Sequence, residues 1–201
     1  MKQPFGVILA GGQATRMGGG DKGMLPLGGQ RLIDHVMDRI SPQVDQLAIN
    51  ANGDPKRWVT LNLPVLADDV ADFPGPLAGV LAGMDWAATA GADHIVTVAA
   101  DTPFFPDDLV PRLLLASQDQ GKPIALAATP TNGKIYRHPT FGLWPVSLRD
   151  DLRAALADGV RKVVQWSDCH GTALAEFPVH RFDPFFNINT PDDLAHAQDL
   201  L

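Results

Sequence analysis

The strongest constraint on the fold is the alternation of short apolar runs with amphipathic stretches along the chain. The run from His94 to Ala100 is almost continuously apolar, as expected of a strand that is covered on both faces. Residues 32–40 instead carry their large apolar side chains at helical spacing, which predicts a helix with one buried face. Repeated alternation of this kind predicts an α/β protein, a three-layer α/β/α sandwich around a mostly parallel, Rossmann-like sheet.

Other segments predict the remaining elements. Further strands are expected at residues 5–9, 46–50, 63–66, 123–128, 140–144 and 179–182. Further helices are expected from Pro76, from about Asp107, around residues 148–156 and from Pro191, which Thr190 would cap. In parallel sheets ligands bind beyond the carboxyl ends of the strands. The loops after residues 9, 50, 66 and 100 are therefore expected to converge on one crevice.

Composition limits the class of protein. The 201 residues are 45% hydrophobic, enough for one globular domain over residues 1–201. Within it, the polar, glycine-containing stretch from Thr129 to Arg137 is expected to separate a nucleotide-binding part at 1–128 from an acceptor-binding part at 129–201. No apolar stretch reaches the ~18 residues of a membrane span. Cys169 is the single cysteine, which points to the cytoplasm. The net charge is −7 and lysines and arginines do not cluster, so a nucleic-acid partner is not expected.

A glycine-rich loop follows the first expected strand, in the sequence LAGGQATRMGGGDK of residues 9–22. Glycines allow backbone N–H groups to approach phosphate oxygens closely, and Arg16 and Lys22 add positive charge there. The pattern indicates a polyphosphate site, with a plain glycine-rich surface loop as the alternative. A Walker A loop is excluded because Gly23, not Ser or Thr, follows Lys22. The GxGxxG pattern at Gly18 lies too far beyond the strand for a dinucleotide fold.

Carboxylates and amides follow the other strands. Asp101 ends an apolar run and faces the glycine-rich loop in the expected sheet, where it either holds Mg²⁺ or caps the following turn. Asp68 and Asp69 either read a base or form a solvated turn, and Asn50 and Asn52 either hold a nucleoside or belong to a turn. A metal-bridged nucleotide with Lys and Arg on its phosphates suits attack at phosphorus. No Ser-His-Asp set is evident, which disfavours ester hydrolysis.

Taken together, these segments resemble the family of molybdenum cofactor guanylyltransferases, within the wider nucleotidyltransferase superfamily. The resemblance rests on the glycine-rich loop and on further motifs along nearly the whole chain: Asn50-Ala51-Asn52, Asp68 with Phe73-Pro74-Gly75-Pro76-Leu77-Ala78-Gly79, Asp101-Thr102-Pro103, Arg137-His138-Pro139, Gly159-Val160-Arg161-Lys162-Val163, and Phe186-Asn187-Ile188-Asn189-Thr190-Pro191. One departure is Ala100, where family members often carry Cys before the metal-binding Asp.

The resemblance implies a nucleotide-diphospho-sugar transferase fold and transfer of GMP from GTP to molybdopterin, or to its molybdenum-loaded form, with Mg²⁺ as cofactor. It also implies partners upstream in cofactor biosynthesis and chaperones of recipient molybdoenzymes. Its site residues, carried over by position, are as follows: Leu9, Ala10, Gly11 and Gly12 would contact GTP through the backbone, Lys22 its phosphates, Asn50 and Asp68 the nucleoside, and Asp101 both GTP and Mg²⁺; Arg16 would stabilise the leaving pyrophosphate; Asn187 and Asn189, with Arg137, His138, Arg161 and Lys162, would face the pterin.

Three alternatives remain open from the sequence. A sister enzyme would use CTP on the same pterin, although the cytidylyl relatives tend to have Leu-Ala-Ala-Gly where this chain has Leu-Ala-Gly-Gly at residues 9–12. A second alternative would act on a sugar phosphate. The third is a non-catalytic nucleotide-binding module, against which the presence of both Lys22 and Asp101 argues.

Overall fold

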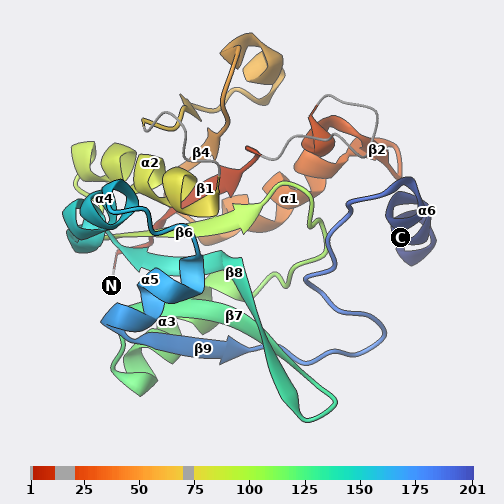
Figure 1. The fold of residues 1–201 in the computed structure, drawn as a ribbon. Coiled ribbons are helices and arrows are strands. Elements are labelled where there is room, and N and C mark those ends of the chain that lie inside the picture. The colour runs from red at the N-terminus through yellow and green to blue at the C-terminus, as the bar shows by residue number, and fades with distance from the viewer. Residues whose placement is uncertain (1, 12–20, 70–74) are drawn as a thin grey trace.

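The computed structural model describes residues 2–11, 21–69 and 75–201. Its centre is a seven-stranded sheet with the strand order β5-β4-β1-β6-β8-β7-β9. Figure 1 shows this sheet in the middle of the molecule, between the helices. The strands of this sheet are β1 (Phe5–Leu9), β4 (Leu47–Asn50), β5 (Val65–Leu66), β6 (His94–Ala99), β7 (Ile124–Thr131), β8 (Lys134–Pro145) and β9 (Thr172–Glu176). A small ribbon pairs β2 (Pro26–Leu27) with β3 (Gln30–Arg31).

Strand direction decides where the loops lie. β1 pairs in parallel with both β4 and β6, β4 with β5, and β7 with β9. β8 is antiparallel to its two neighbours, β6 and β7. All the other strands of the large sheet therefore end at the same edge, and the prediction of a mostly parallel sheet is confirmed.

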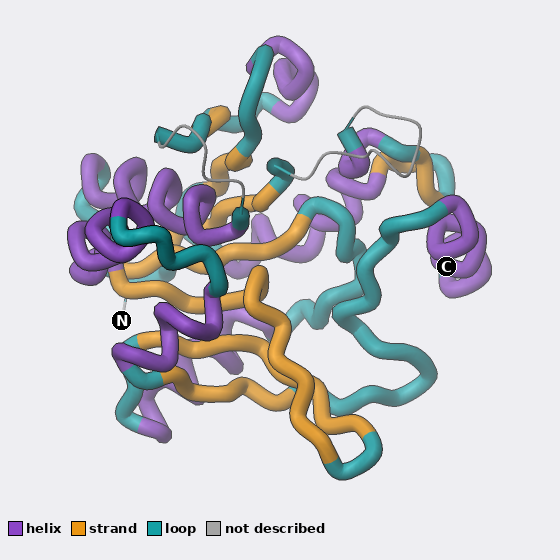
Figure 2. Tube along the Cα trace, viewed as in Figure 1, coloured by secondary structure: helices purple, strands orange, loops and turns teal. Residues whose placement is uncertain are grey.

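Helices cover both faces of the sheet (Figure 2). The helices are α1 (Leu32–Ile40), α2 (Pro76–Thr89), α3 (Leu109–Gln120), α4 (Arg149–Ala157), α5 (Val163–His170) and α6 (Pro191–Leu200). α1 and α3 pack on one face with Ile8 and Val96, and α2, α4 and α5 on the other with Val7 and Ile95. Neighbouring residues of each strand point to opposite layers, which explains why these strands are apolar throughout and confirms the three-layer sandwich.

α2 lies unusually close to the sheet. A Cβ atom at Gly83 would lie 2.7 Å from Val7 Cγ2 and 2.9 Å from Ile95 Cδ1. Gly79, one turn earlier on the same side of the helix, would bring a Cβ to 2.3 Å from Asn50 Oδ1. Gly83 therefore lets the helix backbone approach β1 and β6, and Gly79 lets it approach the ends of β1 and β4.

Two expectations need correction. Residues 179–182 form no strand. The strand in this part of the chain lies earlier, at Thr172–Glu176, and pairs with β7. Pro178 precedes the expected segment and cannot donate a ladder hydrogen bond, and Phe182 packs on Phe104 instead. The strand expected at residues 140–144 is longer and begins at Lys134.

A search of the helices within these described ranges finds none with the length and hydropathy required to cross a bilayer.

Candidate functional site

Backbone hydrogen bonds join three strand ends at one point of the sheet edge. Ala10 donates from its N–H to the carbonyl of Asn50 at 2.9 Å, and Ala100 donates to the carbonyl of Leu9 at 3.1 Å. Among the residues that the structure describes, none beyond its chain neighbours has an atom within 4 Å of a Cβ added at Gly11, so this glycine lies beside open space within the described parts of the chain. Leu9, Ala10, Asn50 and Asp101 are thereby brought to one edge, as the sequence predicts.

The ends of β4 and β5 are joined by a network of amides around one carboxylate. Asn50 is 4% exposed and donates from Nδ2 to Asp68 Oδ1 at 2.8 Å. Asn52 donates to Asp68 Oδ2 at 2.7 Å and accepts from the N–H of Asp68 at 2.8 Å. Each oxygen of Asp68 therefore has one amide partner, which fixes the plane of the carboxylate and leaves further lone pairs for a ligand.

A second cluster joins the first part of the chain to its last segment. Lys22 lies in a short 3₁₀ helix, and its Nζ donates to Asn189 Oδ1 at 2.6 Å and lies 3.5 Å from Asp101 Oδ2. Thr102 donates from its hydroxyl to Asn187 Oδ1, and the N–H of Ile188 donates to the carbonyl of Asp101 at 2.9 Å. Lys22, Asp101, Asn187 and Asn189 therefore form one polar cluster with only partly exposed cation and carboxylate.

The side chains around Asp101 decide whether a metal ion fits at this position. Within the parts of the chain that the structure describes, no three His, Cys, Asp or Glu side chains are grouped as metal ligands. Mg²⁺ is commonly held by one or two carboxylates, with water and substrate phosphates completing its shell. Asp101, whose side chain is 23% exposed, fits such a site as a single protein ligand.

The residues expected to face the acceptor lie on two other elements. On β8, Arg137 donates to both oxygens of Asp168 at 2.8 and 2.9 Å, and His138 stacks on Phe185 with 4.3 Å between ring centroids. Burial lowers the pKa of His138, and the charge of Asp183 opposes that change. Arg161 and Lys162 lie directly before α5, and Arg161 Nη1 donates to the carbonyls of Leu156 and Val160 at 3.0 and 2.9 Å.

Some expected residues fall outside the described ranges. Gly12 and Arg16 belong to residues 12–20, and the Phe73-Pro74 part of one motif belongs to residues 70–74. Sequence reasoning also missed Thr102 as a partner of Asn187, because the two are separated by 85 positions and no local pattern links them.

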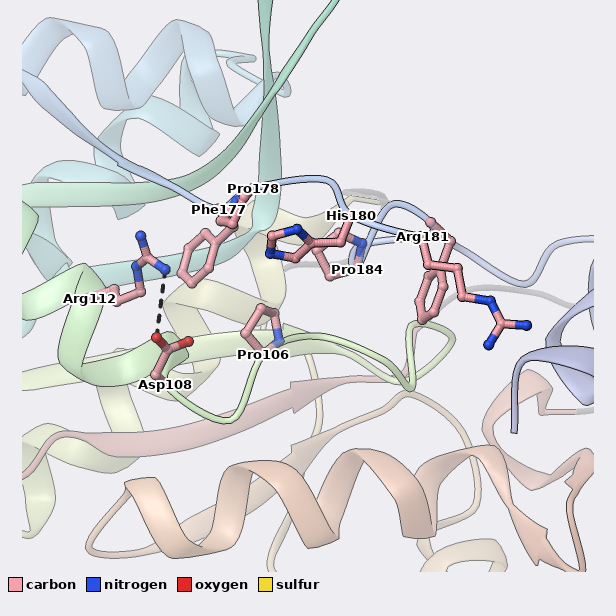
Figure 3. Close-up of a pocket in the computed structure, with 9 residues that line it drawn as sticks. Pro106, Asp108, Arg112, Phe177, Pro178, His180, Arg181 and Pro184 are labelled. Atoms are coloured by element: carbon pink, nitrogen blue, oxygen red, sulfur yellow. Dashed lines mark ion pairs between the residues drawn. The ribbon is translucent and has the colours of Figure 1, made fainter.

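A cavity of about 390 Å³ lies beside the start of α3, and Figure 3 shows its lining. It is lined by Pro106, Asp108, Arg112, Phe177, Pro178, His180, Arg181, Phe182 and Pro184. Arg112 and Asp108 pair across one wall at 3.6 Å, and the guanidinium of Arg112 lies 4.7 Å from the centre of the Phe177 ring. The lining contains none of the site residues expected from the sequence.

Comparisons with known proteins identify the family of the chain. The MobA-like NTP transferase domain family matches residues 6–172. A molybdenum cofactor guanylyltransferase of Rhodopseudomonas palustris (strain BisB5) is 51% identical over 197 residues, which are 96% of this chain and 92% of that protein. Another, from Mesorhizobium japonicum, is 50% identical over 201 residues, with 98% and 95% covered.

Solved structures share the fold. The molybdopterin-guanine dinucleotide biosynthesis protein A of Archaeoglobus fulgidus superposes with a TM-score of 0.72 at 26% identity, covering 98% of this chain and 97% of that one. A 4-diphosphocytidyl-2C-methyl-D-erythritol synthase from Anaerococcus prevotii has a TM-score of 0.75 at 12% identity, covering 99% and 96%, a likeness of fold alone. The nucleotide-diphospho-sugar transferase fold is thus confirmed. With a family match over most of its length and relatives half identical to it, the chain belongs to the MobA-like NTP transferases, among the molybdenum cofactor guanylyltransferases.

Proposed function

We propose that this nucleotidyltransferase moves GMP from GTP onto the phosphate of molybdopterin, or of its molybdenum-loaded form, and releases pyrophosphate. The main support for this proposal is the cluster in which Lys22 contacts Asn189 and Asp101, at the edge of the sheet where the strands end. It puts a cation and a carboxylate from separate elements next to the start of the glycine-rich loop. The names of the half-identical relatives support GTP and the pterin as substrates.

In this proposal the two polar clusters at the edge of the sheet, one around Asp68 and one around Lys22 and Asp101, bind different parts of the nucleotide. The backbone of Leu9, Ala10, Gly11 and Gly12 would cradle the phosphates, with Lys22 neutralising their charge. Asn50 and Asp68 would hold the nucleoside, because Asn50 and Asn52 already orient the Asp68 carboxylate. Arg16 would stabilise the departing pyrophosphate.

The acceptor would enter from the C-terminal part of the chain. In this proposal residues 1–128 bind GTP and residues 129–201 bind the pterin, with Asn187 and Asn189 at the boundary beside Lys22. Arg137, His138, Arg161 and Lys162 are the further candidates on the pterin side. Supply of the pterin by an upstream cofactor-biosynthesis protein and passage of the product to a chaperone of a recipient molybdoenzyme stay predictions, as does a cytoplasmic setting, which the single Cys169 favours.

The reaction needs alignment more than a protein base. An oxygen of the acceptor phosphate forms a bond to the α-phosphorus of GTP, and the bond from that phosphorus to the oxygen bridging to the β-phosphorus breaks, so that pyrophosphate leaves with the electron pair. The attacking phosphate oxygen is already anionic near neutral pH, so no side chain has to remove a proton. Mg²⁺ held by Asp101 would supply charge neutralisation on the phosphates.

The direct test uses purified protein with Mg²⁺, molybdopterin and GTP, CTP or ATP labelled at the α-phosphate. Label from GTP on the pterin is the expected result. Label from CTP would instead assign the cytidylyl activity, and no label on the pterin from any nucleotide would contradict the proposal.

Asp101→Asn tests the role of the carboxylate. Turnover should fall by about 10²-fold or more, because an interaction with the charge of the reacting phosphates is lost, while the melting temperature stays near that of the wild type. Asp108→Asn is the matched control, since Asp108 follows the same strand and pairs with Arg112 in the cavity beside α3. Full Mg²⁺-dependent activity in Asp101→Asn would remove Asp101 from the mechanism.

A further inference from the structure

An ion pair links the connection between β4 and β5 to the end of the glycine-rich loop. Arg57 lies in a 3₁₀ helix at Pro55–Leu61, and its Nη1 donates to Asp21 Oδ1 at 2.8 Å and to Asp21 Oδ2 at 2.9 Å. Asp21 directly precedes Lys22 in the sequence. A residue from the nucleoside side of the site therefore reaches the residue next to the proposed phosphate-binding lysine.

The guanidinium of Arg57 is held by its own surroundings before any ligand binds. Its Nε donates to the carbonyl of Asp54 at 3.1 Å and its Nη2 donates to the carbonyl of Asn52. Gly53 has a φ of +88°, and a Cβ there would lie 3.3 Å from Arg57 Nη2, so glycine at this turn makes room for the arginine. These contacts leave the Nη1 end of Arg57 directed at Asp21.

The burial of the two partners is unequal. The Asp21 side chain is 14% exposed and the Arg57 side chain 40% exposed, so water screens the carboxylate less than it screens the guanidinium. Without a partner, this shielded carboxylate would repel the phosphates of a nucleotide bound at the neighbouring Lys22. This repulsion opposes nucleotide binding.

We propose that Arg57 is a positioning residue for the triphosphate: by engaging Asp21 it cancels the charge of the residue next to Lys22 and so lowers the repulsion that the phosphates meet there. The inference rests on the proposed function, since it assumes that Lys22 meets the phosphates of a nucleotide. It differs from a purely structural role, in which Arg57 would only hold the β4–β5 connection in place. The two roles differ in how variants respond to the number of phosphates on the ligand.

Calorimetric titration with GTP and with GMP, both in the presence of Mg²⁺, separates the two roles. Arg57→Gln should weaken GTP binding about tenfold, with a clearly smaller effect on GMP, which lacks the β- and γ-phosphates. Arg57→Lys, which keeps the charge but not the two-point contact, should fall between the wild type and Arg57→Gln. In turnover, the KM for GTP should rise more than kcat falls.

A sharper test removes the charge of Asp21 as well and asks whether the affinity for GTP recovers. The double variant Arg57→Gln/Asp21→Asn should recover most of the GTP affinity lost by Arg57→Gln, because the carboxylate that Arg57 cancels is gone. Arg153→Gln is the matched control: Arg153 makes the same kind of two-point contact with Asp85, at 2.7 and 2.9 Å, between α4 and α2. It should change thermal stability without changing GTP affinity.

The outcomes distinguish this inference from the proposed function. Equal losses for GTP and GMP, or no recovery in the double variant, would overturn the role of Arg57. If the wild type binds CTP or ATP in place of GTP, the proposed substrate fails, while the same series read with that triphosphate and its monophosphate still decides the role of Arg57. A wild type that binds none of the three triphosphates overturns both.

Discussion

At the residue scale, the geometry of the proposed nucleoside site depends on a glycine as well as on the amides of Asn50 and Asn52. Gly79 in α2 faces the buried carboxamide of Asn50, and a Cβ there would lie 2.3 Å from Asn50 Oδ1 and 2.7 Å from Leu9 Cδ2. Asn50 in turn orients Asp68 through a 2.8 Å hydrogen bond. Asn50 can therefore keep its position because residue 79 of the helix is a glycine and has no side chain.

Gly79→Ala should consequently affect both stability and nucleotide binding. The added methyl group has to displace Asn50, so we expect a loss of about 1–3 kcal/mol in the free energy of unfolding and a rise in the KM for GTP. Gly83→Ala is the control, because the atoms nearest to its Cβ would belong to Val7 and Ile95: stability should fall similarly and KM should stay unchanged. Urea unfolding and steady-state kinetics measure the two quantities, and an unchanged KM in Gly79→Ala would contradict this view of Asn50.

The residues of the site differ in how far the sequence alone reveals them. Asn50, Asp68 and Asp101 are predictable because Asn50 ends an apolar strand, Asp68 and Asp101 each follow one, and parallel strands end at one edge. The contact between Lys22 and Asn189 spans 167 positions, and no local sequence pattern predicts it. Arg57 was equally hidden, since it lies in a segment that carries neither apolar periodicity nor a phosphate motif.

At the element scale, α6 shows how a helix start serves the site. The Thr190 hydroxyl accepts the N–H of Asp193 at 3.1 Å, and Asp193 Oδ2 accepts the N–H groups of Asn189 and Thr190 at 2.9 and 2.8 Å. These hydrogen bonds, that from Asn189 first, lower the pKa of Asp193. The capping box thus fixes the backbone of Asn189, whose side chain contacts Lys22.

Removal of this cap should be seen most clearly in the pH dependence of stability. Because the folded state lowers the pKa of Asp193, its contribution is present above the ordinary value of 3.8 and is lost as pH falls through the folded pKa. Asp193→Asn should lack that acid-dependent component, and Thr190→Ala should cost about 1 kcal/mol. Urea unfolding between pH 7 and pH 3 measures both, with the exposed neighbour Asp192→Asn as control. An acid profile of Asp193→Asn identical to that of the wild type would contradict the assignment.

Elements with local signals were predicted well, and elements without them were not. The start of α6 follows from Thr190, Pro191 and Asp193 alone. α5 and β9 were missed, because Val163-Val164 suits a strand better than a helix and the short β9 has two small alanines as its buried residues. The reversed direction of β8 has a local signal in the sequence: Asn132-Gly133, with φ of 52° and 73°, is typical of a two-residue hairpin turn.

At the scale of the whole molecule, an aromatic cluster joins β8 to the segment that follows β9. Phe185 lies at its centre, 4.3 Å from the ring of His138, 4.9 Å from Phe141 and 5.3 Å from Phe177. His138 is held there by Thr129, with 2.9 Å between Oγ1 and Nε2. Burial lowers the pKa of His138, so the packed molecule favours the neutral imidazole.

Stability should therefore fall in mildly acidic solution. Below the ordinary value of 6.5 the unfolded chain binds a proton at His138 more readily than the folded chain does, so the free energy of unfolding decreases as pH falls toward the lowered pKa. His138→Gln removes the titrating group, and its urea midpoint should change less between pH 7.5 and pH 5.5. His94 also has a pKa lowered by burial, so His94→Gln should remove part of the same slope. Identical slopes in wild type and His138→Gln would contradict the prediction.

The reversal of β8 has a consequence for how such a protein can diversify. The turn at Asn132-Gly133 joins β7 to the antiparallel β8, and the end of β7 and the first residues of β8 extend past the edge where the remaining strands stop, as the projecting hairpin in Figure 1 shows. Insertions or deletions at that tip would reshape one outer wall of that edge and spare the hydrogen bonds that orient Asp68 and Lys22. Under the proposed function, we expect relatives that differ in acceptor to vary at this turn and to keep the residues proposed to bind the triphosphate.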